Sequence, residues 1–496
     1  MSPPDLFPVA PGGHARIREV LRQAGYDGDG IQALAGADLT ALGQRAVPVL
    51  LHRTRGGSPL ETLVRLFTAG AAVPLRAADR ALAPASAAQW AAWGLLALDA
   101  DEARATVQLA CHGDLVLATD WGPATPSVGT SSGYVMGFSP SGLTLARMTV
   151  RPHSRATLDV GTGCGLQALL AAAHSESVLA TDLNPRAVAV ARFNAALNGA
   201  DSVRCVEGDL LAPAAGQVFD IIVSNPPFVV GPPDPHLFMS GGRDLDGLCA
   251  ELVRGAPRHL APGGWCQLLA NWAAPHGTDW REHLARWFDG LDCDAWVIRR
   301  ERQAADEYAA LWIETDADDA AEYTSRFDTW MAYYDAHGVD AVDYGLITMR
   351  RRGDGAPGRR RYDDVRGRWD EAGGADIVEA FARHDWLAAT TDDALLDARL
   401  RVSDAARLSR DHVAVRGEWV PVSALLRTEG GIDDPGGVDP HGERIVAACD
   451  GTTPLRTLLQ ALADTLGSPF AEVTPDALRA VRNLVDRGVL LPPVSG

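Results

Sequence analysis

The sequence predicts an α/β protein whose central domain is a seven-stranded sheet, with a small helical module on either side. The first observation is that β-prone runs alternate with helix-length segments between about residues 121 and 352, which is typical of a parallel sheet with helices on both faces. The second is a cluster of glycines directly after the first of these runs. The third is helical periodicity of apolar residues in the segments before and after this region.

The composition is that of a globular protein with several domains. The chain has 496 residues, of which 47% are hydrophobic and 22% charged, so we expect about two to four domains. No run of 18 apolar residues occurs, and the first residues have neither a basic start nor an apolar stretch. We therefore expect no membrane span, no export, and a cytoplasmic location.

The charged residues and cysteines exclude several kinds of chemistry. All 45 basic residues are arginines, which excludes P-loop and Schiff-base lysines. The seven cysteines form no Cys-x-x-Cys pair, so we predict no metal site. The net charge of −19 opposes general binding to phosphate backbones and favours protein or small-molecule partners.

The flanking modules both have a helical pattern that ends in β-prone runs. Residues 1–120 contain short amphipathic helices followed by two such runs around Gly113, the order of a winged-helix-like domain. This module either caps the next domain or recognises a substrate. Residues 376–496 contain three helices and a closing strand, which fits a second winged-helix-like module.

An arginine-rich stretch follows the sheet domain, which we assign to residues 121–352. Eight arginines lie between residues 350 and 368, together with glycines and a proline. We interpret residues 353–375 as a basic, flexible linker. Contact with a polyanion is the alternative interpretation of these arginines.

The seven predicted strands are ATLDV, SVLATD, SVRCVEGD, FDIIVS, WCQLLANW, AWVIRRE and DYGLITMRRR. A long insertion between the last two strands is rich in tyrosine and tryptophan, from Tyr308 to Tyr334. Aromatic residues at helical spacing are typical of a core. The alternative is that they line a substrate cleft.

A glycine-rich loop follows the first strand directly. Asp159 near the strand end is followed by Gly161, Gly163 and Gly165, and then by a predicted helix. Glycines permit positive φ and leave room for a bulky ligand at the carboxyl ends of parallel strands. The spacing GxGxG differs from the GxGxxG fingerprint of dinucleotide-binding proteins.

Acidic residues follow the next two strands. Asp182 ends the second strand, where it can accept hydrogen bonds from both ribose hydroxyls, and Asp209 and Leu210 follow the third, beside the expected adenine. With Asp159 and the glycine loop they describe a pocket for an adenosine ligand with a charged tail, and no phosphate-binding side chain is evident. We predict S-adenosylmethionine as this ligand; a nucleotide dehydrogenase is the alternative.

The fourth strand leads into the tetrapeptide Asn225-Pro226-Pro227-Phe228. The Asn225 side-chain oxygen and the Pro226 carbonyl can each accept a hydrogen bond from one NH2 group, and Phe228 can stack on the attached planar system. This would direct the nitrogen lone pair at a methyl group next to Asn225, so that catalysis depends on proximity and alignment. We predict Asn225, Pro226 and Phe228 as the catalytic residues.

Two further segments could cover this pocket. Residues 121–141 are rich in Gly, Ser and Pro and include Tyr134 and Phe138 as candidate lid residues, and residues 232–236 include His236. An ordinary loop between domains is the alternative interpretation of the first segment.

Taken together, these motifs resemble class I S-adenosylmethionine-dependent N-methyltransferases, and most of all the release-factor glutamine methyltransferases. The resemblance is carried by LDVGTGCG, TDLNPRAVAVARFNAALNG, the Asn225 tetrapeptide, GGRDLDG and LAPGG, within residues 156–275. It implies a Rossmann-like methyltransferase fold. It also implies site residues: Gly161, Gly163 and Gly165 at the cofactor, Asp182 at its ribose, Asp209 near its adenine, and Asn225 at the acceptor nitrogen.

The acceptor is the least determined part of this interpretation. Phe228 stands where the glutamine methyltransferases usually carry Tyr, and it resembles ribosomal RNA guanine-N2 and adenine-N6 methyltransferases. We expect a protein glutamine side chain. The alternatives are an amino group of an RNA or DNA base, held by the flanking modules, and a binding protein that senses S-adenosylmethionine without catalysis.

Overall fold

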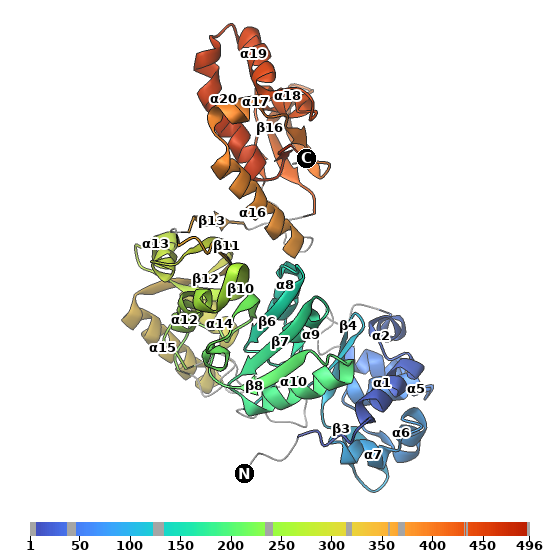
Figure 1. The fold of residues 1–496 in the computed structure, drawn as a ribbon. Helices are drawn as coiled ribbons and strands as arrows, with labels where there is room; N and C mark the ends of the chain where they lie inside the picture. Colours follow the sequence, from blue (N-terminus) through green and yellow to red (C-terminus); the bar gives the residue numbers. More distant parts are fainter. Residues whose placement is uncertain are drawn as a thin grey trace. The chain divides into compact units, whose positions relative to one another are not determined.

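The computed structural model describes residues 6–36, 46–122, 133–233, 242–313, 320–355, 358–365, 373–430, 432 and 435–493. The chain divides into two compact units, Met1–Ala146 with Pro152–Asp363, and Arg147–Arg151 with Asp364–Gly496. Figure 1 follows the chain by colour from one end to the other. Each unit is described by itself.

A mixed sheet lies at the centre of the first unit. Among the residues that the structure describes, it has eight strands in the order β13-β11-β12-β10-β9-β6-β7-β8. They are β6 (Ser154–Val160), β7 (Ser175–Asp182), β8 (Val203–Glu207), β9 (Phe219–Ser224), β10 (Leu260–Pro275), β11 (Cys293–Ala304), β12 (Val339–Arg351) and β13 (Arg360–Asp364). β6 to β10 pair in parallel, whereas β12 is antiparallel to β10 and β11. The expected α/β sheet is present, with one strand more than the seven predicted.

The chain order changes direction between β6 and β9, because β7 and β8 lie on one side of β6 and the later strands on the other. The register pairs Val160 with both Thr181 and Ser224, so these three strands end at nearly the same level. Open α/β sheets bind ligands in the crevice beyond the strand ends at such a point.

Helices precede and connect these strands (Figure 1). They are α8 (Pro140–Met148), α9 (Leu166–Ala172), α10 (Pro185–Asn198), α12 (Gly247–Gly255), α13 (Trp280–Ala285), α14 (Ala305–Trp312) and α15 (Ala320–His337), with short 3-10 turns η2 (Ala212–Ala214), η3 (Ala256–His259) and η4 (Arg286–Phe288). α10 illustrates how the sequence sets the ends: the Asn184 side chain caps its start, Pro185 occupies its first turn, and Gly199 ends it at a φ of 67°.

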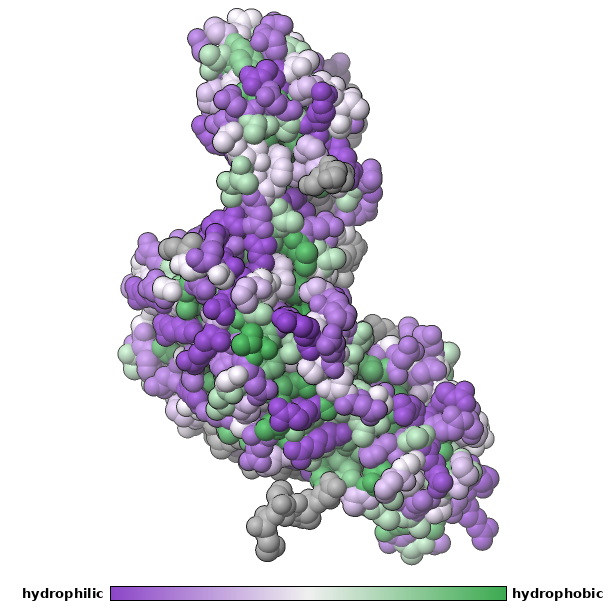
Figure 2. Space-filling view, in the orientation of Figure 1, coloured by the Kyte–Doolittle hydropathy of each residue, from purple (hydrophilic) through white to green (hydrophobic). Residues whose placement is uncertain are grey.

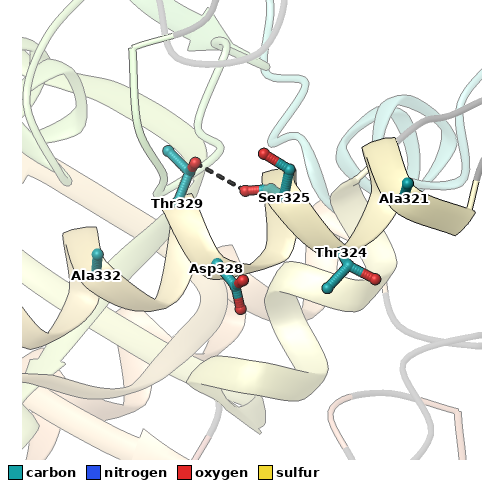
Figure 3. Close-up of a pocket in the computed structure, with 6 residues that line it drawn as sticks. All are labelled: Ala321, Thr324, Ser325, Asp328, Thr329 and Ala332. Carbon is teal, nitrogen blue, oxygen red and sulfur yellow. Dashed lines mark hydrogen bonds between the residues drawn. The ribbon is translucent and has the colours of Figure 1, made fainter.

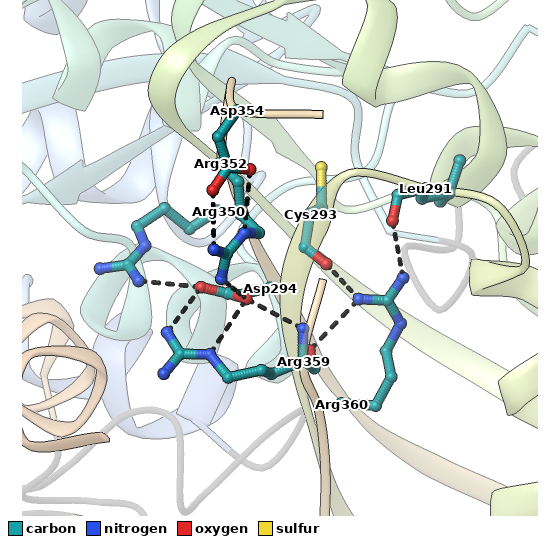
Figure 4. Close-up of polar contacts among 8 residues, drawn as sticks. All are labelled: Leu291, Cys293, Asp294, Arg350, Arg352, Asp354, Arg359 and Arg360. Carbon is teal, nitrogen blue, oxygen red and sulfur yellow. Dashed lines mark hydrogen bonds and ion pairs between the residues drawn. The ribbon is translucent and has the colours of Figure 1, made fainter. Parts of the chain in front are cut away.

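The eighth strand comes from the arginine-rich stretch. Residues 360–364 form β13 beside β11, so part of the segment interpreted as a flexible linker is a strand of the sheet. The buried Asp294 accepts hydrogen bonds from Arg350 at 3.0 Å, Arg359 at 2.9 Å and Arg352 at 3.4 Å (Figure 4). Burial alone would raise the pKa of Asp294, but the hydrogen bonds from Arg359 and Arg350 outweigh it and lower that pKa.

Arg360 is bound by backbone carbonyl groups rather than by a carboxylate. Its guanidinium donates to the carbonyl of Leu291 at 3.0 Å and to that of Cys293 (Figure 4), as well as to Phe288 at 3.0 Å. The prediction of flexibility was wrong for residues 360–364 because charge, Gly and Pro indicate a solvated chain only when the charges lack partners. Residues 366–372 of the predicted linker lie outside the described residues.

The N-terminal module belongs to the same unit. Its elements are α1 (Gly13–Ala24), α2 (Gly28–Ala35), α4 (Ala46–Arg53), α5 (Pro59–Phe67), β1 (Val73–Pro74), α6 (Leu75–Ala81), α7 (Ala87–Ala92), β2 (Leu96–Leu98), β3 (Glu102–Ala105), β4 (Gln108–His112) and β5 (Leu115–Thr119). β1, β3 and β2 form one small sheet, and β4 and β5 form the hairpin expected around Gly113. The winged-helix assignment stays a prediction.

Helix α10 joins the N-terminal module to the large sheet. Asn194 accepts a hydrogen bond from the Ala118 amide at 2.7 Å and donates to the Ala118 carbonyl at 2.9 Å, and Asn198 binds Val116 in the same way one turn later. The Phe7 and Phe193 rings are 4.4 Å apart. One hydrophobic core therefore continues across residue 120, where the sequence suggested a domain boundary.

The second unit has its own core. Its elements are α16 (Gly374–Ala389), α17 (Asp392–Asp397), β14 (Arg401–Val402), β15 (Ala406–Val415), β16 (Glu418–Thr428), β17 (Gly436–Gly437), α18 (Pro440–Ala448), α19 (Leu455–Leu466), α20 (Phe470–Asp486) and β18 (Leu490–Leu491). The core packs Leu459, Leu478 and Val485 together. The long β15–β16 hairpin, absent from the sequence prediction, is largely exposed, with 74% of Trp419 accessible.

The surface is mixed in polarity. Figure 2 shows hydrophilic and apolar residues intermingled over the visible face. No helix within the described ranges is long and apolar enough to cross a membrane.

Candidate active site

A cavity of about 720 Å³ lies at the carboxyl ends of the parallel strands. All the predicted site residues except Gly165 line it, namely Asp159, Gly161, Gly163, Asp182, Asp209, Leu210, Asn225, Pro226 and Phe228. Four separate strand-end motifs therefore converge on one space, as the parallel register requires.

The glycine loop leaves open space where side chains would otherwise project. Gly161 and Gly163 have φ values of 70° and 55°, and a Cβ atom on either would meet no atom of the described residues within 4 Å. A ligand can therefore approach this backbone closely. Gly165 does not line the cavity, and a Cβ there would lie at an ordinary contact distance of 3.4 Å from Ala191 of α10. It precedes α9 with a φ of 88°, a conformation that favours glycine.

Asp159 fixes the shape of the loop from within. Its carboxylate accepts hydrogen bonds from the Thr162 hydroxyl at 2.6 Å and from the Ala168 amide at 3.0 Å. The side chain is buried, and burial raises the pKa of Asp159 to about 7. The residue thus ties the loop to the start of α9 and can change its charge near neutral pH.

Asp182 also holds backbone amides. It accepts from the Gly163 amide at 2.9 Å and from the Asn184 amide at 2.9 Å, and burial raises its pKa. Each carboxylate oxygen keeps a second lone pair for a ligand.

Asp209 and Leu210 lie further out along the same cavity. Asp209 is 2.9 Å from the guanidinium of Arg243, and its side chain is half exposed. Leu210 has a φ of 44°, an uncommon conformation for a residue with a side chain. The ion pair and the turn together fix the wall next to the expected adenine.

Asn225 and the glycine loop follow neighbouring strands of the sheet. Its neighbour Ser224 pairs with Val160, so Asn225 and Gly161 leave adjacent strands at the same level. The Asn225 Oδ1 atom is buried and has no hydrogen-bond partner among the residues that the structure describes. The Phe228 ring lies 6.0 Å from that of Tyr344. The tetrapeptide thus presents an unused acceptor atom and an aromatic face to the cavity.

The aromatic insertion holds the chain that follows the tetrapeptide. The Val230 amide donates to the hydroxyl of Tyr308 at 3.3 Å, and the hydroxyl of Tyr334 donates to the Val230 carbonyl at 2.8 Å. Tyr308 and Trp312 line the cavity, and Tyr308 also belongs to the buried cluster that contains Trp330 and Tyr334. The core interpretation of the insertion is therefore confirmed, and its role in a substrate cleft stays a prediction.

Sequence reasoning missed Asn271 and Tyr344 as cavity residues, and it left open whether Tyr308 and Trp312 belong to a cavity or to a core. Asn271 lies in the apolar run LLANWAA of β10, and Tyr344 pairs with it from β12. A polar residue in the middle of a buried strand is itself a signal, because burial of an unpaired amide is costly. For Tyr308 and Trp312 the sequence carries no signal that separates cavity from core.

The candidate lid segments are only partly described. Tyr134 lines the cavity, and Phe138 packs 5.7 Å from the ring of His112. Residues 123–132 and 234–241, including His236, lie outside the described residues.

A second, shallow depression lies on the outer side of α15 (Figure 3). Among the described residues its lining comes from this one helix and consists of small side chains with Asp328 as the sole charged group. The hydroxyl of Thr329 donates to the Ser325 carbonyl at 2.9 Å, an ordinary contact within a helix. Because no groups from different elements converge there, it offers no comparable chemistry.

Residues 139–289 match the family described as "Methyltransferase small domain". Their glycine loop, acidic strand ends and Asn225 tetrapeptide occupy one cavity at the strand ends. The central segment is a class I methyltransferase domain. Its cofactor is S-adenosylmethionine, and its sequence is similar to that of release-factor glutamine methyltransferases.

Three relatives indicate the range of similar proteins. The release factor glutamine methyltransferase of Xylella fastidiosa is 40% identical over 132 residues, 24% of this chain and 47% of that protein. The ribosomal protein uL3 glutamine methyltransferase of Bradyrhizobium diazoefficiens is 38% identical over 176 residues, 32% and 46% of the two chains. The ribosomal RNA small subunit methyltransferase C of an Enterobacter species is 36% identical over 143 residues, 27% and 37%.

The chain thus spans about half the length, or less, of the curated relatives it matches. Two further families match outside the methyltransferase domain, both described as domains of unknown function: DUF7059 over residues 23–106 and DUF7782 over residues 378–492.

Proposed function

We propose that this protein transfers a methyl group from S-adenosylmethionine to the side-chain amide nitrogen of a protein glutamine. The observation that carries the proposal is the buried Oδ1 of Asn225, which no described residue pairs with and which lies in the same cavity as the glycine loop. A buried amide oxygen without a partner is costly unless a ligand supplies a donor, and an NH2 group is such a donor.

The cofactor half of the cavity fits S-adenosylmethionine. Gly161 and Gly163 leave room for a bulky group against the backbone. Asp182 would accept the ribose hydroxyls, and Asp209 and Leu210 would lie beside the adenine. When bound, the cofactor supplies an electrophilic methyl group, and the carboxylates of this half favour its positive charge.

The residues of the tetrapeptide would act by orientation. The Asn225 oxygen and the Pro226 carbonyl would each accept one N–H of the acceptor, while Phe228 would stack on its planar group. With both N–H bonds held, the nitrogen lone pair is left to face the methyl group, so alignment supplies most of the catalysis.

A protein acceptor is supported by charge and by the relatives. The chain has a net charge of −19, which opposes association with phosphate backbones. Two of the relatives described above are glutamine methyltransferases that act on a release factor and on a ribosomal protein, as their names state. A cytoplasmic location, the two flanking winged-helix-like modules and their part in substrate recognition stay predictions.

A nucleobase amino group is the second candidate acceptor. It is favoured by Phe228 in place of Tyr and by the similarity to a ribosomal RNA methyltransferase. Such an enzyme would bring the base to Asn225 by flipping it out of the stack.

One experiment separates these candidates. The protein is incubated with S-adenosylmethionine labelled on the methyl group and a cell extract, and the products are digested with protease or with nuclease. We expect label that protease releases and nuclease does not. Label lost only to nuclease would replace the first candidate by the second, and cofactor binding with no transferred label would indicate a sensor.

A further inference from the structure

The strongest unexplained feature of the cavity is a second asparagine, Asn271 of β10. Only 2% of its surface is exposed, and it lines the same cavity as Asn225. One atom of its amide lies 2.6 Å from the hydroxyl of Tyr308. The other has no hydrogen-bond partner within the described part of the chain. Half of this buried amide is therefore available to a ligand.

The hydrogen bonds around Tyr308 indicate which atom of the Asn271 amide is available. With the Asn271 nitrogen toward Tyr308, the phenol oxygen receives two N–H donors, from Asn271 and Val230, and the oxygen of the Asn271 amide lies buried without a donor. Oxygen and nitrogen of an amide are assigned from such networks. Rotation of the amide by half a turn lets Tyr308 donate to the oxygen, and 2.6 Å suits O–H···O better than N–H···O. The Asn271 nitrogen then becomes the unpaired atom.

Asn225 and Asn271 lie within reach of one ligand group. Ser224 pairs with Leu268, so Asn225 is level with the residue after Leu268, and Asn271 lies two residues further along the same face of β10. Asn225 offers an acceptor and Asn271 offers a donor. A primary carboxamide has the complementary pair, an NH2 group and a carbonyl oxygen.

We propose that Asn271, oriented by Tyr308, binds the carbonyl oxygen of the acceptor carboxamide while Asn225 binds its NH2 group. The pair then selects an amide over a carboxylate, because a carboxylate oxygen in place of the NH2 group would face the Asn225 oxygen. This proposal deepens the proposed function, on which it rests, by assigning the residues that recognise the acceptor.

A nucleobase edge with an amino group beside a ring nitrogen has a similar donor and acceptor pattern. The backbone phosphates of such a nucleic acid would, however, need cationic side chains on the protein. Among the described lining residues the sole cation is Arg300, which pairs with Glu301 at 3.5 Å. Arg350 and Arg359 lie at the opposite edge of the sheet and are bound to Asp294 (Figure 4). The observations therefore favour the carboxamide.

The test compares Asn271→Asp with Asn271→Ala in the extract-labelling assay, with cofactor affinity measured by calorimetry. Both variants should bind S-adenosylmethionine within about twofold of the wild type and label protein at least about tenfold more slowly, the loss expected for one hydrogen bond to the acceptor.

The pH profile gives a signature that a structural role would not produce. A protonated Asp at position 271 regains an O–H donor for the acceptor carbonyl, and burial favours the protonated form. Relative to the wild type, Asn271→Asp should therefore recover activity as the pH falls from 8 to 6, whereas Asn271→Ala should not.

A pair of tyrosine variants provides the matched control. Tyr308 and Tyr334 both hold Val230, but only Tyr308 contacts Asn271. Tyr308→Phe should raise the acceptor KM clearly more than Tyr334→Phe. Equal effects would mean that loop position alone matters and would overturn the role of Tyr308.

The outcomes for the two proposals are distinct. Wild-type protein that labels neither protein nor nucleic acid contradicts the proposed function, and label in nucleic acid contradicts the carboxamide. Wild-type labelling of protein together with full activity of Asn271→Ala overturns the inference about Asn271 and leaves the proposed function intact.

Discussion

The two halves of the cavity differ in how their polar groups are paired. In the cofactor half, Asp159 and Asp182 each hold two donors of the surrounding chain, mostly backbone amides. In the acceptor half, Asn225 and Asn271 each keep a buried amide atom that no described residue pairs with. The first half is shaped before any ligand binds, while the second keeps its hydrogen bonds for the ligand, so substitutions should separate binding of the cofactor from turnover.

The largest effect is expected from Asn225→Ala. Removal of the amide deletes the group that would align the acceptor nitrogen, so the rate of methyl transfer should fall by at least about a hundredfold. Affinity for S-adenosylmethionine, measured by calorimetry, should change by less than about twofold. Asp182→Ala is the reciprocal variant, and it should weaken cofactor binding instead. Unchanged turnover in Asn225→Ala would remove this residue from the mechanism.

A smaller effect is expected from Gly161→Ala. The added methyl group would occupy the space that the glycine leaves open, and affinity for S-adenosylmethionine should fall about tenfold. Gly290→Ala is the matched control, because Gly290 has a φ of 75° and open space around it but does not line the cavity. Both variants should lose about 1–2 kcal/mol of stability from backbone strain. Equal cofactor affinity in the two would mean that the loop does not contact the cofactor.

The sequence could predict the site residues that follow a strand directly, but not those that lie within a strand or on an inserted helix. Gly161, Asp182 and Asn225 follow strands directly, and the parallel register brings strand ends together wherever they lie in the chain. A local motif is then enough. Asn271 lies inside a strand and Tyr308 on a helix of an insertion, so their meeting depends on how α14 packs, which no local pattern determines.

The eighth strand was missed for a related reason. Arginines among Gly and Pro predict a solvated linker, but Asp294 and the carbonyl of Leu291 bind them in the folded chain. Those partners are distant in sequence, and neither is part of a recognisable motif.

The affinity for the cofactor should depend modestly on pH, which would distinguish the cofactor half further from the acceptor half. Because burial raises the pKa of Asp159 to about 7, the side chain is mostly protonated at pH 6 and mostly ionised at pH 7.5. The positively charged cofactor should favour the ionised form, so its affinity should rise by roughly threefold to tenfold over this range. Calorimetry at both pH values measures this change.

In the cofactor-free protein, a rise in pH should have the opposite effect and lower the stability of the fold. A carboxyl whose pKa is raised by folding stabilises the fold at low pH, and this contribution is lost as the pH rises through about 7. The Tm of the cofactor-free protein should therefore fall between pH 6 and 7.5. Asp159→Asn should weaken both trends, and an undiminished pH dependence in that variant would assign them to another group, of which Asp182 is the nearest candidate.

The smallest effect is expected from Leu311→Ala in α14. Leu311 is 63% exposed and lines the cavity, and we assign it to the acceptor half because it lies on α14 with Tyr308. Its truncation should change stability by less than about 0.5 kcal/mol. Cofactor affinity should not change, and the acceptor KM should rise a few-fold because an apolar contact is lost. Leu466→Ala, at a residue that is 43% exposed on α19, controls for truncation of a surface leucine. Weaker cofactor binding with an unchanged acceptor KM would show that α14 borders the cofactor, and the division of the cavity into two halves would have to be redrawn.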